Sequence, residues 1–459
     1  MESVDLIVIG SGPAGYNAAL QADELGKRVV VVEQQSAIGG TSVHTGTIPS
    51  KALREAALYL SGFRQRAFYG VDYRLDNDVS IADLTRRVGG VIRNEVSQLV
   101  EHLRKKEIPV YSGHAAFIDP HRVRITGTEG EREVRADKIL IATGSRPAHS
   151  PNVPVDGVGI VDTDMLPRLR SVPRSLTIIG GGVIGIEYAS MAAALGTKVT
   201  VVDTRPRLLE FADDEIVALL VESIGALGVS FRLGVEVEGA EMRGPGDAVT
   251  RLVGGEELHS DVILYAVGRQ SNTEELNLGA AGLTADKRGR LTVNESYQTS
   301  VPHIYAAGDV IGFPSLASVS MDQGRLAASH AFGQTCNLLS PLTPFGIYSV
   351  PEISFVGQTE EELAAAGTPY RVVRARYEDA ARGQIIGDTT GLLKLIFDPE
   401  SRRVLGVHIL GESAADLVHI GQAVMALCGT LDYFIDNAFN YPTLAQCYKL
   451  AALAADDPQ

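Results

Sequence analysis

Residues 5–16 read DLIVIGSGPAGY, and residues 176–187 read LTIIGGGVIGIE. Each stretch is a short apolar run followed by the pattern G-x-G-x-x-G and a helix-like segment. A second apolar run then ends in an acid at the same distance from the first glycine: Glu33 closes RVVVVE, and Asp203 closes KVTVVD. One such pattern is weak evidence. Two copies with strand, helix and acid in register predict two βαβ units of the dinucleotide-binding type.

The glycines of each pattern allow a tight turn and let the backbone approach a pyrophosphate, which the N-terminus of the following helix attracts. The acid can accept hydrogen bonds from ribose hydroxyls. The alternative for each copy is a plain βαβ turn with no ligand. The residues predicted to bind dinucleotides here are Gly10, Gly12, Pro13, Ala14, Gly15 and Glu33 in the first copy, and Gly180, Gly182, Val183, Ile184, Gly185 and Asp203 in the second.

The second copy carries two arginines, Arg205 and Arg207, directly after its acid. Asp203 favours NAD, because a carboxylate accepts from the ribose 2′-hydroxyl. Two guanidinium groups suit the 2′-phosphate of NADP instead. The combination predicts a site that accepts both coenzymes; the alternative is a solvated arginine pair at a surface turn.

A chain of 459 residues is long enough for about three domains. The repeated units predict an α/β protein with two Rossmann-type domains, and residues 144–157, rich in proline and polar side chains, suggest a crossover between them. The C-terminal part lacks a glycine pattern and alternates short strands with an apolar helix, which predicts an α+β domain with an antiparallel sheet. The expected boundaries are 1–150, 151–270, a return to the first domain over 271–341, and 342–459.

Composition excludes several classes of function. The formal net charge of −15 argues against nucleic acid and anionic membrane surfaces as partners. No apolar run approaches the length of about 18 residues that spans a bilayer, and no signal peptide is visible. Cys336, Cys428 and Cys447 are widely spaced, so we expect no disulfide framework, no metal site and a reducing cytoplasmic location.

Residues 39–51, GGTSVHTGTIPSK, resemble the redox-active segment of the flavin disulfide reductases, such as dihydrolipoamide dehydrogenase and glutathione reductase. Those enzymes carry two cysteines where this chain has Ser42 and Thr47, and a hydroxyl cannot form a disulfide. Their C-terminal HPTxxE segment corresponds to NYPTLAQ, residues 440–446, in which Tyr441 and Gln446 replace the acid–base pair. Four losses that serve one half-reaction predict that dithiol chemistry is gone.

Within that group, TIPSK (47–51), DTRPR (203–207), FPSLAS (313–318), GIYSVPEIS (346–354) and NYPT (440–443) together resemble the soluble pyridine nucleotide transhydrogenases. The resemblance covers essentially the whole chain. It implies FAD in the first domain, NAD or NADP in residues 151–270, and a homodimer formed through the C-terminal domain. That family typically keeps a cysteine at the position of Ser42 and a glutamate at that of Gln446. His44 matches a family histidine, and its role, packing, hydrogen bonding or catalysis, stays open.

The resemblance also implies roles for single residues. Lys51 and Glu187 are expected to pair beside the nicotinamide as catalytic residues; the alternative is two exposed helix charges. The run PHIYAAGD (302–309) is expected to form a strand that ends at Asp309. Asp309 is expected to close over FAD, although it could instead cap a helix. A helix from about Ser318 would direct its N-terminus at the flavin. The other residues expected to bind the cofactors are Gly40, Thr41, Thr47, Ala115, Thr143, Gly144, Gly268, Leu316 and Ala317.

These expectations combine into one function. We predict an FAD-dependent transhydrogenase that moves hydride between NADPH and NAD⁺ at one nicotinamide site, used by the two coenzymes in turn. One alternative is an oxidoreductase that passes electrons from NAD(P)H to a quinone or another small acceptor. The other is a non-catalytic FAD-binding homologue, against which the retention of Lys51, Glu187 and Arg205 argues.

Overall fold

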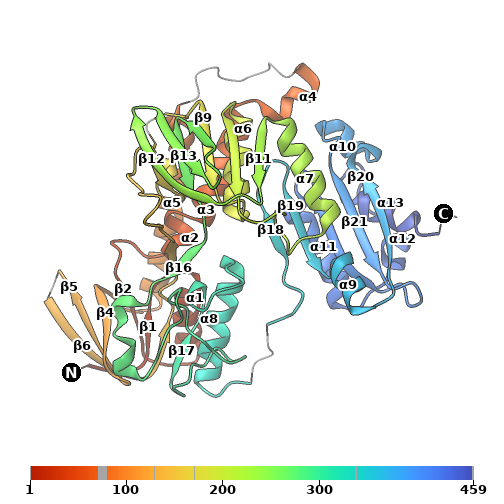
Figure 1. The fold of residues 1–459 in the computed structure, drawn as a ribbon. Coiled ribbons are helices and arrows are strands. Elements are labelled where there is room, and N and C mark those ends of the chain that lie inside the picture. The colour runs from red at the N-terminus through yellow and green to blue at the C-terminus, as the bar shows by residue number, and fades with distance from the viewer. Residues whose placement is uncertain (1, 71–79, 129, 170, 336–338, 457–459) are drawn as a thin grey trace. The chain divides into compact units, whose positions relative to one another are not determined.

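The computed structural model in Figure 1 describes residues 2–70, 80–128, 130–169, 171–335 and 339–456; Cys336 lies outside these ranges. The chain forms two compact units. The first contains residues 1–53, 85–148 and 268–339, and the second contains residues 54–84, 149–267 and 340–459. Two helices cross the division along the chain: α3 (Thr47–Leu60) and α5 (Ile81–Lys105).

The first unit is built on a seven-stranded sheet with the order β3-β2-β1-β6-β5-β4, in which β17 also pairs with β6. Strands β3, β2, β1, β6 and β17 are parallel, whereas β4, β5 and β6 form an antiparallel meander. The strands are β1 (Glu2–Ile9), β2 (Val29–Glu33), β3 (Val110–Ser112), β4 (His114–Asp119), β5 (Arg122–Gly127), β6 (Gly130–Ile141) and β17 (Ile304–Ala306).

Apolar residues of β1 and β2 are buried on both faces of this sheet, as expected for parallel strands covered on two sides. Helices α1 (Pro13–Glu24) and α8 (Ala317–Ala331) lie side by side (Figure 1). Their backbones approach so closely at Gly324 that a Cβ there would lie 1.9 Å from the carbonyl oxygen of Ala14. The remaining elements are α2 (Gly40–His44), β7 (Ser145–Pro147), β16 (Arg269–Ser271) and the 3₁₀ turns Glu274–Leu276, Leu278–Ala281 and Asp309–Ile311.

The second unit contains a five-stranded parallel sheet with the order β11-β10-β9-β15-β8. In both Rossmann-type sheets the strand order reverses beside the strand that precedes the glycine-rich turn, β1 or β9, which is where ligands bind in doubly wound folds. The elements are β8 (Ile160–Asp162), β9 (Ser175–Ile179), α6 (Val183–Ala194), β10 (Lys198–Asp203), α7 (Asp214–Ala226), β11 (Val229–Leu233), β15 (Val262–Tyr265), and an antiparallel sheet of β12 (Val237–Gly244), β13 (Asp247–Leu252) and β14 (Glu257–Ser260).

A second five-stranded sheet, β18-β19-β22-β21-β20, is wholly antiparallel and belongs to the same unit. Its apolar core includes the buried rings of Tyr377, Phe397, Phe434 and Tyr448. The elements are β18 (Phe345–Ile347), β19 (Ile353–Gly357), α9 (Glu360–Ala366), β20 (Arg371–Arg376), α10 (Ala381–Ile386), β21 (Leu392–Phe397), β22 (Val404–Leu410), α11 (Ala414–Ala426), α12 (Asp432–Asp436) and α13 (Gln446–Leu453); shorter pieces are α4 (Arg66–Tyr69) and the 3₁₀ turns Phe63–Gln65, Leu166–Arg168 and Tyr377–Asp379.

This architecture confirms the predicted fold class, with two Rossmann-type sheets and a C-terminal α+β part. One local prediction differs. The strand expected to end at Asp309 ends at Ala306, because Gly308 takes a left-handed φ of +81° and Asp309 starts a 3₁₀ turn. Within the described ranges, every helix is too short or too polar to cross a lipid bilayer.

Candidate dinucleotide-binding sites

The first glycine-rich turn joins β1 to α1 and tolerates only glycine at its first position. Gly10 has a φ of +102°, and a Cβ on it would lie 2.3 Å from the backbone oxygen of Ala142. A Cβ on Gly15 would lie 1.9 Å from the carbonyl oxygen of Gly10. Helix α1 begins at Pro13, and among the described residues its N-terminus has no side-chain cap. Its first amide groups are therefore suited to an anionic ligand.

Glu33 ends β2 at this turn and is 7% exposed. Its carboxylate accepts hydrogen bonds from the amide and hydroxyl of Ser11, at 3.0 and 2.5 Å, and from the amide of Gln35 at 2.8 Å. The Ser11 hydroxyl in turn accepts from the amide of Gly39 at 3.1 Å. A carboxylate offers about four acceptor sites, so Glu33 retains capacity for a ribose hydroxyl.

The end of β6 contributes an unsatisfied polar group. The buried hydroxyl of Thr143 has no hydrogen-bond partner among the described residues. Nearby, a Cβ on Gly40 would lie 2.8 Å from the Cα of Gly12, so the chain after β2 runs close to the turn. Thr41 donates its hydroxyl to the carbonyl of Ser145 at 3.4 Å. An unpaired buried hydroxyl beside a cradle that excludes side chains fits a bound dinucleotide such as FAD.

A polar network ties Asp309 to the same strand end. Ser145 donates its hydroxyl to Asp309 at 2.6 Å. Arg269 donates its Nε to the hydroxyl and its Nη2 to the carbonyl oxygen of Ser145, both at 2.7 Å. The amide of Gly308 donates to the Oε1 of Gln323, in α8, at 2.8 Å. Sequence reasoning missed Arg269 and Gln323, although an arginine directly after Gly268 and a glutamine within DQGR were available signals.

The segment that resembles a redox centre forms two helices in the first unit. Ser42, in α2, donates its hydroxyl to the carbonyl of Gly39 at 3.2 Å. Ring nitrogen Nε2 of His44 donates to the carbonyl of Ile38 at 2.8 Å, so His44 has a local hydrogen-bonding role. Lys51 lies in α3 and donates to the hydroxyl of Ser50 at 3.3 Å.

The other residues expected to bind the cofactors lie at defined places. Thr47 starts α3, Leu316 precedes α8 as its N-cap, and Ala317 is the first residue of that helix. Ala115 is buried in β4, opposite Ile125. Gly144 takes a left-handed φ of +67° directly after Thr143.

The second glycine-rich turn, between β9 and α6, repeats the geometry of the first. Gly180 has a φ of +108°, and a Cβ on it would lie 2.6 Å from the carbonyl oxygen of Ala266. A Cβ on Gly185 would lie 2.0 Å from the carbonyl oxygen of Gly180. Helix α6 begins at Val183, again without a side-chain cap among the described residues. This geometry fits the pyrophosphate of a second dinucleotide. Gly268, another residue expected to bind a cofactor, falls in the first unit.

Asp203 ends β10 and is 7% exposed. Its Oδ2 accepts from the amide of Gly181 at 2.7 Å and from Nη2 of Arg205 at 2.7 Å, while Oδ1 accepts from the amide and Nε of Arg205 at 2.8 and 2.9 Å. Burial raises the pKa of Asp203, but the hydrogen bonds from Arg205 outweigh it and lower the pKa overall. Arg207 forms an ion pair with Asp214. Arg205 is therefore held against Asp203, whereas Arg207 is tied to the first turn of α7.

Glu187 is buried in α6, with 3% exposure, so it is not an exposed helix charge. Its carboxylate accepts from the amide of Tyr348 at 2.9 Å, and the hydroxyl of Ser190, one turn later, accepts from the amide of Val350 at 3.0 Å. Lys51 belongs to the first unit and Glu187 to the second. The expected pairing of the two remains a prediction.

The C-terminal positions lack the features of a thiol acid–base pair. Tyr441 is 73% exposed, and Gln446 starts α13. Cys447 is fully buried, which raises the pKa of its thiol to about 12, whereas Cys428 is exposed. Throughout the described part of the chain, histidine, cysteine and acidic side chains form no group that could hold a metal ion.

Comparison with known proteins identifies relatives along the whole chain. Residues 4–324 match the model of the pyridine nucleotide-disulphide oxidoreductases, and residues 343–452 match the dimerisation domain of that family. A soluble pyridine nucleotide transhydrogenase of Mycobacterium bovis is 48% identical over 99% of this chain and 97% of its own. One from Photobacterium profundum is 42% identical over 98% of this chain and 96% of its own.

Solved structures agree with these matches. The flavoprotein disulfide reductase RclA of Escherichia coli, solved as a Cu(II) complex, is 28% identical, covers 99% of both chains and has a TM-score of 0.88. LpdA of Mycobacterium tuberculosis is 27% identical over 98% of this chain and 99% of its own, with a TM-score of 0.89. With both glycine-rich turns intact and both domain models matched, the chain belongs to the pyridine nucleotide-disulphide oxidoreductase family.

Proposed function

We propose that this protein is an FAD-dependent transhydrogenase that moves hydride between NADPH and NAD⁺ without a redox-active disulfide. The observation that carries the proposal is the contrast between two intact dinucleotide turns and an absent dithiol apparatus. Both turns have glycines that no other residue could replace. Ser42, Thr47, Tyr441 and Gln446 stand where disulfide reductases place their thiols and acid–base pair. The names of the relatives, soluble pyridine nucleotide transhydrogenase, support the same activity.

We assign the domains as residues 1–150 with 271–341 for FAD, residues 151–270 for NAD or NADP, and residues 342–459 for a homodimer interface. The match of residues 343–452 to a dimerisation domain supports the last assignment. In the first domain, the residues assigned to FAD surround the Gly10 turn, Glu33, Thr143 and Asp309. In the second, Asp203 would accept from the 2′-hydroxyl of NAD, and Arg205 and Arg207 would bind the 2′-phosphate of NADP.

When bound, FAD supplies the two-electron chemistry, and the protein supplies binding, orientation and electrostatics. The helix N-termini at Pro13 and Val183 would stabilise the negative charge of the pyrophosphates, and the backbone amides of the glycine turns would donate to them. Glu187 is fixed by the amide of Tyr348, so its carboxylate is oriented before a coenzyme arrives. We assign Lys51 and Glu187 to the reacting end of the site. No side chain has to gain or lose a proton in the net exchange, because hydride leaves one nicotinamide and arrives at the other.

We also propose that the protein acts in the cytoplasm, with nicotinamide dinucleotides as its substrates. The relatives' description as soluble enzymes supports this location. The proposal includes neither a nucleic-acid partner nor a membrane partner, in keeping with the net charge of −15.

The test mixes purified protein, loaded with FAD, with NADPH and thionicotinamide-NAD⁺ and no other acceptor. Appearance of the reduced thio analogue is the expected result, and its absence would refute the proposal. Ser42→Ala is the matched control. Its hydroxyl donates to the nearby backbone carbonyl of Gly39, so exchange should continue at the wild-type rate without it. Quinone reduction far above coenzyme exchange would instead favour the small-acceptor alternative.

A further inference from the structure

The loop between β10 and α7, residues 204–213, carries both coenzyme-selecting arginines and packs against the C-terminal antiparallel sheet. The ring of Phe211 lies 5.1 Å from that of Phe345, in β18, and 6.2 Å from that of Phe355, in β19, between centroids. All of these residues belong to the second unit. The sheet that the family uses for dimerisation therefore also supports the loop after Asp203.

A buried ion pair fixes the end of this loop. Asp213 is the N-cap of α7, is fully buried, and accepts from the amide of Ile216 at 3.3 Å. Both of its carboxylate oxygens also accept from Nζ of Lys394, in β21, at 2.8 Å. Lys394 is 1% exposed. Burial lowers its pKa, but hydrogen bonds to Asp213 and to other carboxylates outweigh this and raise it, so the lysine is charged.

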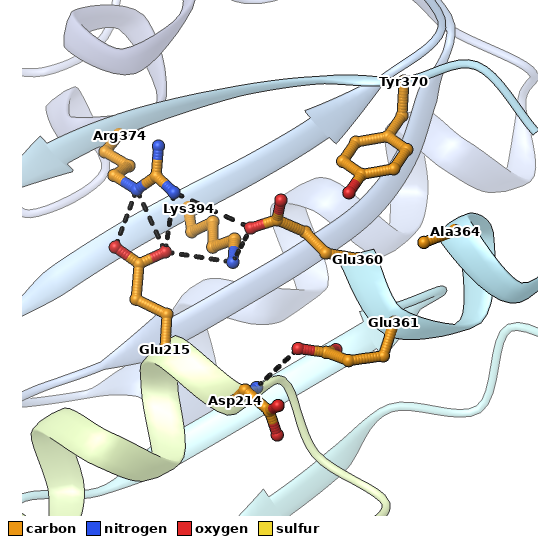
Figure 2. A pocket seen from close by; sticks show the side chains of 8 residues that line it. All are labelled: Asp214, Glu215, Glu360, Glu361, Ala364, Tyr370, Arg374 and Lys394. Carbon is orange, nitrogen blue, oxygen red and sulfur yellow. Dashed lines mark hydrogen bonds and ion pairs between the residues drawn. The ribbon is translucent and has the colours of Figure 1, made fainter.

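Further charges surround this pair and line an open pocket of about 460 Å³ (Figure 2). Lys394 also pairs with Glu215, at 3.0 Å, and with Glu360. Glu215 is shared with Arg374 at 2.7 Å. On the other side of the pocket, Glu361 accepts from the amide of Asp214 at 3.3 Å. The first turn of α7 is therefore held by side chains from β20, β21 and α9.

The loop itself has an unfavourable backbone that needs such support. Leu209 has a φ of +47°, in the left-handed region that a bulky residue rarely adopts, and is 1% exposed. Leu208, its neighbour, contacts the glycine turn closely enough that a Cβ on Gly181 would lie 2.5 Å from its Cδ2. From this loop, Arg207 reaches the first turn of α7 and pairs with Asp214. The position of Arg207 thus depends on the position of that turn.

We propose that Lys394 and Asp213 position the coenzyme-selecting loop, and that through Arg207 they set the preference for the 2′-phosphate of NADP over the 2′-hydroxyl of NAD. This inference rests on the proposed function, because it deepens the role of the same site. A buried ion pair is weak evidence for stability, whereas fixing one geometry among alternatives is a well-attested use of such groups. Lys394 acts here as a positioning residue and touches no coenzyme.

The experiment measures binding of two probes, 2′,5′-ADP and 5′-AMP, by titration calorimetry on the full-length, FAD-loaded protein. The main variant is Lys394→Met with Asp213→Asn, which removes both charges of the pair, while asparagine retains the capping ability. We expect the Kd of 2′,5′-ADP to rise about tenfold, the effect of one misplaced charge-assisted hydrogen bond. The Kd of 5′-AMP should change less than about twofold, because that probe lacks the 2′-phosphate. Arg376→Met, on the exposed side of β20, is the control.

A double-mutant cycle with Arg207→Ala separates positioning from general damage. If Lys394 and Asp213 act through Arg207, their replacement in the Arg207→Ala background should change the Kd of 2′,5′-ADP less than about twofold. Equal weakening of both probes, additive effects in the cycle, or no effect at all would each overturn the proposal. Phe211→Leu is the second variant, for use if the main variant does not fold. It loosens the packing of the loop against Phe345 and Phe355 without removing a buried charge, and should cause the same selective loss of affinity for 2′,5′-ADP.

The design also separates this inference from the proposed function. A wild-type protein that binds 2′,5′-ADP but performs no coenzyme exchange refutes the function, while the binding cycle still decides the role of Lys394. If the wild-type protein exchanges hydride but the variants keep its selectivity between the two probes, only the inference is refuted.

Discussion

The two glycine-rich turns have similar backbone geometry but differ at the residue after their first glycine. In the first turn this residue is Ser11, whose hydroxyl donates to Glu33 and accepts from Gly39. In the second it is Gly181, and the space that a side chain would fill is taken by Leu208 from the loop after Asp203. The first turn is thus closed by its own side chain, whereas the second admits a loop that carries two arginines.

The acids at the two turns differ accordingly. Among the described residues, the donors to Glu33 are the neutral groups of Ser11 and Gln35. Asp203 forms a two-point ion pair with Arg205, a geometry that combines charge with direction. Turns with the same backbone can therefore differ in their ligands: in the proposed assignment, the side chains around the acid select the 2′-substituent.

The largest effect is expected when the glycines that the turns share are replaced. Gly10→Ala combines a left-handed φ with a Cβ 2.3 Å from a backbone oxygen, so it should destabilise the first unit by about 3 kcal/mol and abolish FAD binding. Gly180→Ala should retain FAD but bind neither NADH nor NADPH. Flavin absorbance per chain and coenzyme titration measure the two outcomes. Full FAD occupancy in Gly10→Ala would contradict the assignment of the first turn.

The next effect concerns the arginine that only the second acid has. Arg205→Ala should raise the Kd of NADPH about 30-fold, because a charge-assisted hydrogen bond to the 2′-phosphate contributes about 2 kcal/mol. It should leave the Kd of NADH unchanged or lower, since each oxygen of Asp203 loses its guanidinium donor, keeps one backbone amide donor, and gains capacity for the 2′-hydroxyl. Titrations with each coenzyme would measure the two Kd values. Arg174→Ala, which removes an 89% exposed side chain in the same unit, is the control, and parallel loss of both coenzymes would argue against the assignment.

Exchanging Ser11 and Gly181 between the two turns should lower the free energy of unfolding by smaller amounts, which differ between the two variants. Gly181→Ser places a Cβ 2.5 Å from the Cδ2 of Leu208 and should lower the free energy of unfolding by about 2 kcal/mol. Ser11→Gly removes a hydroxyl but creates no clash, so about 1 kcal/mol is expected. Urea unfolding of both variants decides the order, and a larger cost for Ser11→Gly would reverse the interpretation.

The smallest expected effect is a pH dependence. The pKa of Asp203 is lowered in the folded protein, so the ionised form contributes stability above its unfolded pKa, and this contribution is lost as the pH falls through the lower folded pKa. Wild type should lose up to about 1 kcal/mol below about pH 4 relative to Asp203→Asn, because Arg205 is 42% exposed and solvent screens the pair. Melting temperatures from circular dichroism across the acid range would test this, and parallel curves would contradict it.

The parts of the fold that depend on local pattern were predictable from the sequence. Residues 81–105 have helical periodicity over their whole length and form α5 with those bounds. The two turns were recognisable because glycine, strand and acid lie within one short stretch. The end of the strand before Asp309 was less predictable. Gly308 can continue or end that strand depending on its φ, and the residue type does not determine the φ of a glycine.

The networks around the turns join residues far apart in the chain, and no local pattern records them. Ser145 meets Asp309 and Arg269, and Glu187 meets the amide of Tyr348. Lys394, within the strand LLKLIF, is buried and pairs with Asp213, which lies 181 residues earlier at the N-cap of α7. Such partners are determined by tertiary packing, which one sequence alone does not reveal.

The close contact of α1 with α8 at Gly324 has a consequence for synthesis on the ribosome. The first unit begins at the N-terminus, but α8 and β17 emerge only after residues 149–267, which form a parallel sheet from contiguous chain. The apolar side of α1 therefore stays partly uncovered during synthesis, while the parallel sheet of residues 149–267 can already form. A nascent chain halted before Ile304 would hold a complete parallel sheet from residues 149–267, while the first unit still lacks β17 and α8.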